Sequence, residues 1–275
     1  MDTISLMVSV DERYLDRLRT MLFSVCTNNA HESFRVYLLH GGIAPDLLDR
    51  FVKDAKSLGF AYEPLLLDDE LFAQAPTADR YPREMYFRFM APLVLPQDCK
   101  RVLYLDPDVL VINRLRPLWD LDLEGKAFAA AAHTQKTDLA TYANNIRLNT
   151  EHPYYNSGVF LMDVEAFRDI FSLDAMRAFV EERRMTLVLP DQDLFNALFG
   201  REIYPLDDML WNYDARNYST YLLRSGGNAD TDWVMKHTVI LHFCGSPKPW
   251  DRFYRYRFGI LYKHYDHLAQ RYMKG

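Results

Sequence analysis

The sequence predicts an α/β protein in which a mostly parallel β-sheet carries helices on both faces. Two observations lead to this class. In the first hundred residues, short apolar segments of strand length alternate with longer segments whose apolar residues have helical spacing. The chain of 275 residues is 49% hydrophobic and 25% charged, which suits a folded protein with a substantial core. No internal repeat or Gly/Ser-rich linker interrupts the chain, so we expect one continuous domain.

The first half of the chain predicts a regular series of strands and helices. Residues 4–10 form an apolar strand candidate, and the spacing of apolar residues over 11–27 predicts an amphipathic helix. Asp11 is placed to cap that helix, because a short acceptor side chain binds the free backbone amides at a helix start. Further strands are expected at residues 34–39, 62–67 and 102–105, and further helices at residues 45–59 and 85–93.

Beyond residue 110 the pattern is less regular. Strands are expected at residues 128–132, 157–163 and 239–243, and helices at residues 174–184 and 193–199. Asp191 and Asp193 are candidates for the N-cap of the second of these helices.

Charge and cysteine content narrow the functional class. The chain has 32 Lys and Arg against 38 Asp and Glu, a net charge of −6, which disfavours nucleic-acid binding because phosphate contacts require excess cations. Cys26, Cys99 and Cys244 lie far apart without metal-ligand spacing, so we expect reduced thiols with structural or incidental roles.

The amino terminus lacks a basic export signal, and no apolar run reaches about 18 residues. We therefore expect a cytoplasmic protein whose membrane contact, if any, is peripheral.

Residues 251–275 combine basic and aromatic side chains, and this composition has two interpretations. One is a terminal helix that docks on the body of the protein through its aromatic side. The other is peripheral binding to the inner face of an anionic membrane. The basic residues are Arg252, Arg255, Arg257, Lys263, Arg271 and Lys274.

A pair of aspartates directly follows the predicted strand at residues 102–105. Asp106 and Asp108 are two residues apart, and such side chains point the same way in an extended chain. Pro107 favours extended geometry at Asp106. Open α/β sheets bind ligands at the carboxyl ends of their strands, and two carboxylates there suit Mg²⁺ or Mn²⁺. Other Asp-x-Asp pairs occur in the chain, so a solvated loop is the alternative.

Three further segments carry candidate site residues. In the segment from His242 to Trp250, His242 ends an apolar strand and could be a third metal ligand, while Lys248 lies between two prolines as a point charge for phosphate. Gly245 in the same segment would let the backbone approach a ligand closely. Asn156 precedes another strand and could orient a hydroxylated ligand. The third segment is Pro190-Asp191-Gln192-Asp193.

Taken together, these motifs resemble glycosyltransferase family 8. The residues that carry the resemblance are Tyr104-Leu-Asp106-x-Asp108, Asn156-Ser-Gly158, Asp191-Gln192-Asp193 and His242-Phe-x-Gly245-x-x-Lys248-Pro-Trp250, over residues 4–250. The resemblance implies a GT-A (Rossmann-like) fold in a single domain over residues 1–250. Residues 1–110 would form its nucleotide-binding half and residues 111–250 its acceptor half, followed by a C-terminal helix over 251–275.

The resemblance also implies an activity and residue roles. The protein would be a retaining enzyme that moves galactose or glucose from a UDP-hexose to a hydroxyl of a glycan, lipid-linked or envelope acceptor, with Mn²⁺ or Mg²⁺. Metal ligands would be Asp106, Asp108 and His242. Asp11 and Tyr14 would bind uracil, Arg88 the donor, Gly245 and Lys248 the diphosphate, and Asn156, Asp191 and Gln192 the donor sugar.

Two features of this sequence bear on the mechanism and the donor. Gln192 is the residue expected beside the anomeric carbon, and an amide favours a front-face route over attack by a carboxylate such as Asp191. Where the family often has an acid after the strand at residues 128–132, this chain has Ala131-Ala132-His133, which leaves the hexose open.

Two alternative functions compete with this interpretation. The strand followed by Asp106 and Asp108 is also similar to the first motif of haloacid-dehalogenase-like phosphatases. A non-catalytic sugar-binding protein is the second alternative.

Overall fold

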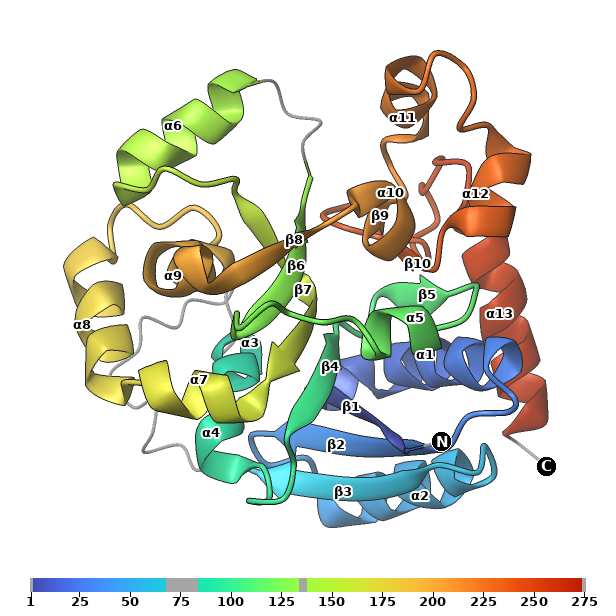
Figure 1. Cartoon of the computed structure of the whole chain (residues 1–275). Helices are drawn as coiled ribbons and strands as arrows, with labels where there is room; N and C mark the ends of the chain where they lie inside the picture. The colour runs from blue at the N-terminus through green and yellow to red at the C-terminus, as the bar shows by residue number, and fades with distance from the viewer. Residues whose placement is uncertain (1, 68–83, 134–137, 274–275) are drawn as a thin grey trace.

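The protein is described here by a computed structural model that covers residues 2–67, 84–133 and 138–273 (Figure 1). Its strands are β1 (Ile4–Ser9), β2 (Phe34–His40), β3 (Ala61–Leu66), β4 (Arg101–Leu105), β5 (Val109–Val111), β6 (Phe128–Ala132), β7 (Tyr155–Asp163), β8 (Ile203–Leu206), β9 (Tyr213–Asp214) and β10 (Ile240–His242). A seven-stranded sheet has the order β3-β2-β1-β4-β7-β6-β8, and a three-stranded sheet has the order β5-β10-β9.

The larger sheet confirms the expected mixed, mostly parallel arrangement. Strands β1 to β4 run parallel, whereas β7 is antiparallel to both of its neighbours, β4 and β6. Alternate side chains of β1 and β4 pack into two separate hydrophobic cores, one on each face of the sheet. Leu6 and Leu103 face the core beneath the first helices, while Met7 and Tyr104 face the core on the opposite side.

The helices are η1 (Glu12–Tyr14), α1 (Leu15–Asn28), α2 (Pro45–Lys56), α3 (Glu84–Phe87), η3 (Arg88–Met90), α4 (Ala91–Val94), α5 (Arg116–Trp119), α6 (Asp138–Leu148), α7 (Val164–Ile170), α8 (Leu173–Arg183), α9 (Pro190–Phe199), η4 (Gly200–Glu202), α10 (Asp208–Trp211), α11 (Tyr218–Arg224), α12 (Thr231–His237) and α13 (Gly259–Tyr272). Helices cover both faces of the larger sheet, while α11 and α12 pack in a third core with β9 and β10 of the smaller sheet (Figure 1).

Most elements expected in the first half are present, with one refinement. Asp11 caps the first turn as expected, because its side chain accepts hydrogen bonds from the backbone amides of Arg13 and Tyr14. The single helix expected over residues 85–93 is instead three short turns, α3, η3 and α4. Pro92 lacks the backbone N–H that a continuous α-helix would need at that point.

The carboxyl-terminal segment docks on the body of the protein, as the first interpretation of residues 251–275 expects. Helix α13 lies beside α1 (Figure 1), and the Tyr265 hydroxyl accepts a hydrogen bond from Asn28 over 2.9 Å. Thr20 donates to Asp266 over 2.8 Å, and Tyr262 is fully buried. These contacts use aromatic side chains on which the membrane interpretation depended, and nothing in the described residues supports membrane contact. None of the described helices has the length and apolar character needed to cross a bilayer.

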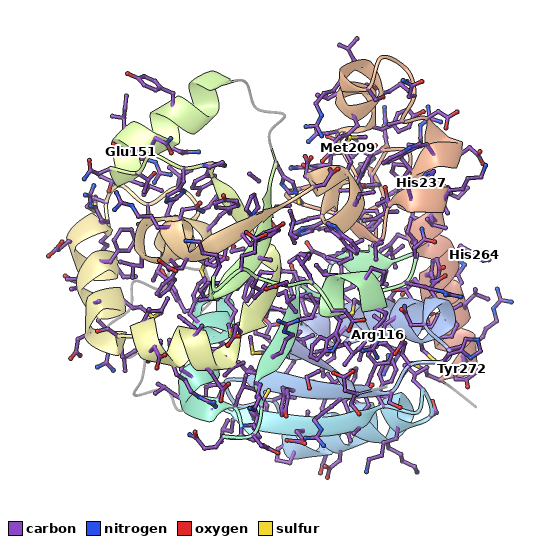
Figure 2. All side chains as sticks on the ribbon, viewed as in Figure 1. Arg116, Glu151, Met209, His237, His264 and Tyr272 are labelled. Carbon is purple, nitrogen blue, oxygen red and sulfur yellow. The ribbon has the colours of Figure 1, made fainter. Side chains whose placement is uncertain are left out.

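An ion-pair cluster ties the start of the chain to the loop after β5. Arg116, labelled in Figure 2, begins α5 and donates hydrogen bonds to both carboxylate oxygens of Glu32 and to Asp2. The Glu32 carboxylate is largely buried, with 13% of its side chain exposed. The hydrogen bonds from Arg116 hold the pKa of Glu32 below its usual range.

Candidate functional site

Two clefts meet at the carboxyl end of β4. The smaller, of about 180 Å³, is lined by residues at the end of β1 and from η1, α3 and η3, including Asp11, Tyr14 and Arg88. The larger, of about 570 Å³, extends over the second half of the chain. Asp106 and Asp108 line both clefts. The larger cleft also contains Asn156, Asp191, Gln192, His242, Gly245 and Lys248, so the sequence-predicted residues all lie in one continuous region.

The two aspartates are held by strands on either side. The backbone N–H of Asp106 donates to the carbonyl of Gly158 in β7 over 2.8 Å. The carbonyl of Asp108 accepts from Phe243, just after β10, over 3.0 Å. The short Asp-Pro-Asp segment therefore crosses from the larger sheet to the smaller one with both ends anchored, and its side chains stay at the point where the clefts join.

His242 completes a group of three potential metal ligands. Its Nε2 atom lies 3.4 Å from Oδ1 of Asp108 and 4.0 Å from Oδ2 of Asp106. One ligand atom from each of the three side chains lies within 4.8 Å of the other two. Gly158 leaves space beside them, because a Cβ there would lie 2.4 Å from Oδ2 of Asp106 and 2.5 Å from Cε1 of His242.

The donor set fits a divalent cation. Oδ1 of Asp108 is buried and accepts no hydrogen bond from any described residue, which is costly for a carboxylate oxygen unless another positive group binds it. Two carboxylates and one imidazole are ligands that Mn²⁺ and Mg²⁺ accept. In the described structure the positive charge nearest to Asp108 is Lys248, which donates to Oδ2 of Asp108 and, over 2.9 Å, to the Phe243 carbonyl.

The two carboxyl groups have different electrostatic surroundings. Burial raises the pKa of Asp106 above its usual value, although the guanidinium of Arg88 opposes this shift. Burial acts in the same direction on Asp108, but Lys248 and His242 outweigh it and lower the pKa of Asp108 below its usual range. Asp108 is therefore the more firmly ionised of the pair.

Arg88 organises the opposite side of the aspartate pair. Its guanidinium contacts Oδ1 of Asp106 at 3.1 Å and Oδ2 of Asp191 at 3.3 Å, and it donates to the Ser157 carbonyl over 2.6 Å. It also lies over the ring of Tyr104, whose hydroxyl donates to Oδ1 of Asp106 over 2.8 Å. This buried arginine therefore fixes two carboxylates of the site relative to each other.

A continuous chain of amide hydrogen bonds links His242 to Gln192. Nδ1 of His242 donates to Oδ1 of Asn212 over 2.8 Å, and Nδ2 of Asn212 donates to Oδ1 of Asn156 over 2.9 Å. Nδ2 of Asn156 in turn donates to Oε1 of Gln192 over 3.0 Å. The backbone N–H of Gly158 also donates to Asn156 over 3.0 Å. Each amide is thereby held in one orientation.

The expected capping role of Asp191 and Asp193 is wrong. The N-cap of α9 is Leu189, and no side chain caps it. Asp191 instead accepts a hydrogen bond from the Ser157 hydroxyl over 2.9 Å. Asp193 is fully buried, where it pairs with Arg147 and accepts from the amides of Val188 and Leu189 in the preceding loop. Neither aspartate therefore occupies the N-cap position, although Asp193 reaches back to two backbone amides that precede the helix.

Asp11 and Tyr14 line the smaller cleft, as expected for residues at a strand end. The Asp11 carboxylate also pairs with Arg13, whose side chain is 74% exposed. Tyr14 contacts Trp250 edge-on, with ring centroids 6.1 Å apart. A residue that lines the smaller cleft is therefore in contact with the segment that contains Lys248.

Several residues in or beside the larger cleft were not expected from the sequence. His133 follows β6, Cys244 follows His242, and both line the larger cleft. Asn212 lies between α10 and β9 in no recognisable motif, so only its contacts identify it. Arg216 pairs with Asp214 and approaches Gly245, whose missing Cβ would lie 2.2 Å from Nη1 of that arginine. A strand-end position is the one sequence signal that could have pointed to His133 and Cys244.

Comparison with known proteins agrees with this geometry. A family model described as glycosyl transferase family 8 matches residues 5–253. General stress protein A of Bacillus subtilis is 29% identical over 263 residues, which cover 93% of this chain and 90% of that protein. A lipopolysaccharide 1,2-glucosyltransferase of Escherichia coli is 23% identical over 95% of this chain and 77% of its own length.

Solved structures share the fold. The galactosyltransferase LgtC, determined with donor and acceptor sugar analogues, superposes with a TM-score of 0.81 at 23% identity over 96% of each chain. The glycosyltransferase GlyE of Streptococcus pneumoniae superposes with a TM-score of 0.72 at 20% identity, over 100% of this chain and 63% of its own. These matches confirm the GT-A fold. The family match excludes the phosphatase and the non-catalytic alternatives: the chain belongs to glycosyl transferase family 8 and is a glycosyltransferase of the hexosyltransferase class.

Proposed function

We propose that this enzyme transfers glucose or galactose from a UDP-hexose to an acceptor hydroxyl, with retention of anomeric configuration and with Mn²⁺ or Mg²⁺ as cofactor. The observation that carries the proposal is the position of Asp106, Asp108 and His242 at the junction of the two clefts. A nucleotide in the smaller cleft and a sugar in the larger one would place the diphosphate at this junction.

The proposed donor position assigns a role to each side chain of the two clefts. Tyr14 would stack on uracil, and Asp11 would accept a hydrogen bond from the imide N–H of uracil. Arg13, which pairs with Asp11, has an exposed side chain and can move away to make this possible. Lys248 and Gly245 would contact the diphosphate. Asn156, Asp191 and Gln192 would line the hexose. We likewise propose residues 1–110 as the nucleotide-binding half and residues 111–250 as the acceptor half. His242 and Lys248 belong to the acceptor half by sequence but would contribute to the nucleotide-binding site.

In the proposed reaction, the acceptor oxygen bonds to the anomeric carbon while the bond from that carbon to the β-phosphate oxygen breaks. UDP leaves with the bonding electrons, and the acceptor proton passes to a phosphate oxygen. When bound, the divalent cation neutralises charge on the departing diphosphate. Lys248 would add a second positive charge once it turns from Asp108 to the diphosphate.

Retention of the anomeric configuration is best explained here if the acceptor oxygen attacks from the side of the leaving group. The carboxylate of Asp191 is already bound by Ser157 and Arg88, which suits a fixed group that holds sugar hydroxyls better than an attacking nucleophile. Gln192, oriented by Asn156, would stabilise positive charge at the anomeric carbon through its amide oxygen.

The acceptor we propose is a glycan or lipid-linked component of the cell envelope, which the lipopolysaccharide glucosyltransferase relative supports. Cytoplasmic synthesis is supported by the three free cysteines, Cys26, Cys99 and Cys244, because stable disulfides are rare in that compartment. The hexose itself remains a choice between glucose and galactose.

Hydrolysis of a panel of nucleotide sugars without acceptor tests this proposal. We expect UDP-glucose or UDP-galactose to be cleaved faster than any GDP- or CMP-sugar, and only when Mn²⁺ or Mg²⁺ is present. UDP should also raise the melting temperature more with Mn²⁺ than with EDTA, since ligands stabilise the folded state by mass action. Preference for a purine nucleotide, or equal thermal shifts in both conditions, would contradict it.

A further inference from the structure

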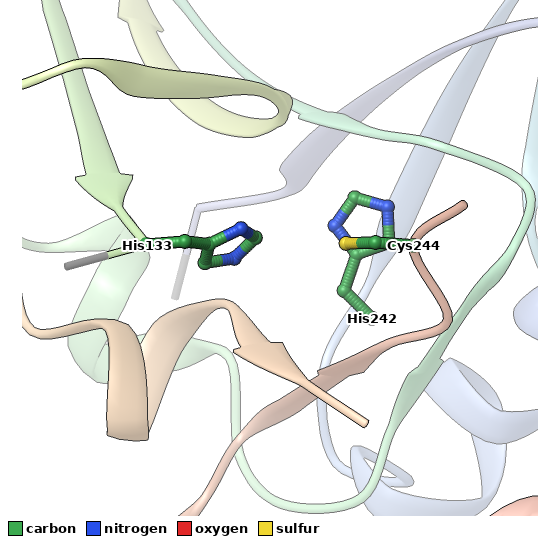
Figure 3. A group of neighbouring side chains, drawn as sticks. All are labelled: His133, His242 and Cys244. Atoms are coloured by element: carbon green, nitrogen blue, oxygen red, sulfur yellow. The ribbon is translucent and has the colours of Figure 1, made fainter. Parts of the chain in front are cut away.

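A second group of metal-ligating side chains lies beside the first. His133, His242 and Cys244 come together in the wall of the larger cleft, and one ligand atom from each lies within 4.8 Å of the other two (Figure 3). The group joins the end of β6 to the end of β10. The proposed transfer reaction uses His242 but gives no role to His133 or Cys244.

Both imidazoles are already oriented as metal-binding histidines usually are. Nε2 of His133 donates to the backbone carbonyl of Asn212 over 2.8 Å, and Nδ1 of His242 donates to the side-chain oxygen of the same residue over 2.8 Å. Asn212 is itself buried, with 1% of its surface exposed. A histidine that donates one ring N–H to a fixed oxygen keeps its other nitrogen as a lone-pair donor.

The donor set favours a different cation from the one proposed for transfer. Asp106, Asp108 and His242 offer two oxygens and one nitrogen, whereas this group offers two nitrogens and one sulfur. Thiolate and imidazole together select Zn²⁺ over Mn²⁺ and Mg²⁺, and three protein ligands with one water complete a tetrahedral site. Tetrahedral zinc ligands lie about 3.5 Å apart, so small side-chain rotations would close the group around the ion.

We propose that His133, His242 and Cys244 form a Zn²⁺ site, and that Zn²⁺ bound there inhibits sugar transfer. A neutral imidazole has one lone pair and serves one cation at a time, so a His242 engaged by Zn²⁺ is lost to Asp106 and Asp108. The binding half of this proposal stands by itself, while the inhibition half rests on the proposed metal-dependent function.

Cobalt binding tests the site without any activity measurement. Co²⁺ replaces Zn²⁺ in such sites, and a thiolate ligand gives a sulfur-to-cobalt charge-transfer band in the near ultraviolet. The wild-type enzyme should show this band, and Zn²⁺ should abolish it. The band should be absent from Cys244→Ser, weakened in His133→Gln and unchanged in Cys26→Ser, a matched control outside both clefts. No band in the wild type, or a band that persists in Cys244→Ser, would overturn the site.

Inhibition is then measured as UDP-hexose hydrolysis at fixed Mn²⁺ with increasing Zn²⁺, relative to the zinc-free rate of each variant. Cys244→Ser should need at least about tenfold more Zn²⁺ for half inhibition, as expected for the loss of one ligand, and Cys26→Ser should match the wild type. Equal inhibition of all three would refute the inhibitory role. If no metal-dependent hydrolysis is seen, the proposed function is wrong. The cobalt band would still show whether His133, His242 and Cys244 bind a metal ion.

Discussion

Asn212 accepts a hydrogen bond from Nδ1 of His242 over 2.8 Å, and this contact determines that Nε2 faces Asp106 and Asp108. The same amide donates to Asn156 over 2.9 Å. One residue that lines neither cleft therefore sets the position of a proposed metal ligand and, through Asn156, the position of Gln192.

Replacement of Asn212 should separate these two effects. Asn212→Leu removes both hydrogen bonds, and we expect the Mn²⁺ concentration for half-maximal activity to rise by about 10- to 100-fold, with a lower kcat. Asn212→Asp keeps an acceptor for Nδ1 of His242 and should retain most of the metal response while kcat still falls. A Mn²⁺ titration of Asn212→Leu that matches the wild type, in a variant with native melting temperature, would show that the contact has no such role.

A methyl group at residue 158 should block the proposed metal site. In Gly158→Ala the added Cβ would lie 2.4 Å from Oδ2 of Asp106 and 2.5 Å from Cε1 of His242, both in a crowded site. We expect activity to fall by about a hundredfold or more, because displacement of reacting groups by about 1 Å has effects of this size. The added stabilisation by UDP with Mn²⁺ should also be lost.

Gly200→Ala is the matched control for that experiment. The atoms nearest to its new Cβ belong to the imidazole of His152, which does not line either cleft. Metal response and turnover should stay at the wild-type level there. Normal activity of Gly158→Ala would mean that the three side chains do not bind the cation that transfer requires.

Substitutions at residues 191 and 192 test the route of retention. Gln192→Ala should lower kcat by about ten- to a thousandfold, the effect of losing one polar transition-state contact. If Asp191 instead attacked the anomeric carbon, Asp191→Ala would be almost inactive and azide would restore turnover with an inverted glycosyl azide as product. We expect no such product. Its isolation from a correctly folded Asp191→Ala enzyme would establish the carboxylate as nucleophile.

The Glu32–Arg116 pair should make stability depend on pH. Because Arg116 lowers the pKa of Glu32 in the folded state, the pair stabilises the protein above the unfolded pKa of about 4.3, and this contribution disappears as the pH falls through the folded value. Glu32→Gln should reduce the free energy of unfolding by about 1–3 kcal/mol at pH 7, and the difference from wild type should shrink below about pH 4.

Denaturant unfolding of both proteins across this pH range measures the effect. The exposed Glu151, labelled in Figure 2, supplies the control, since Glu151→Gln should change stability by no more than about 0.5 kcal/mol at any of these pH values. A Glu32→Gln deficit that is independent of pH would assign the loss to packing and not to charge.

Local sequence signals predicted most of the strands and the site residues at their ends, but not β5, β8 or β9. Buried strands such as β1 and β4 are continuous apolar segments. Asp106 directly follows β4, and His242 is the last residue of β10. Capping was predicted correctly for Asp11, where the acceptor and its amides are neighbours in sequence. For Asp191 the same reasoning failed, because Ser157, 34 residues away, offers the carboxylate a hydroxyl donor.

Residues whose role depends on distant contacts left no trace in the sequence. Asn212 joins His242 to Asn156, which are 30 and 56 positions away, and its own neighbours show no pattern. Strands β5 and β9 were missed because they have only three and two residues, too few to establish a periodicity. Cys244 lies two residues after His242, but His133 is far away in the sequence, so the group of three became evident only in three dimensions.

The packing of α13 against α1 has a consequence for how the protein is made. Thr20 and Asn28 of α1 donate hydrogen bonds to residues of α13 that lie 246 and 237 positions later in the chain, and Met273 completes the core beneath β1. During synthesis, part of one face of the amino-terminal strands therefore stays uncovered until α13 has left the ribosome. Chaperones that shield apolar surface on nascent chains would bind this face until then, and a stop codon before residue 259 would release a chain that lacks this covering helix.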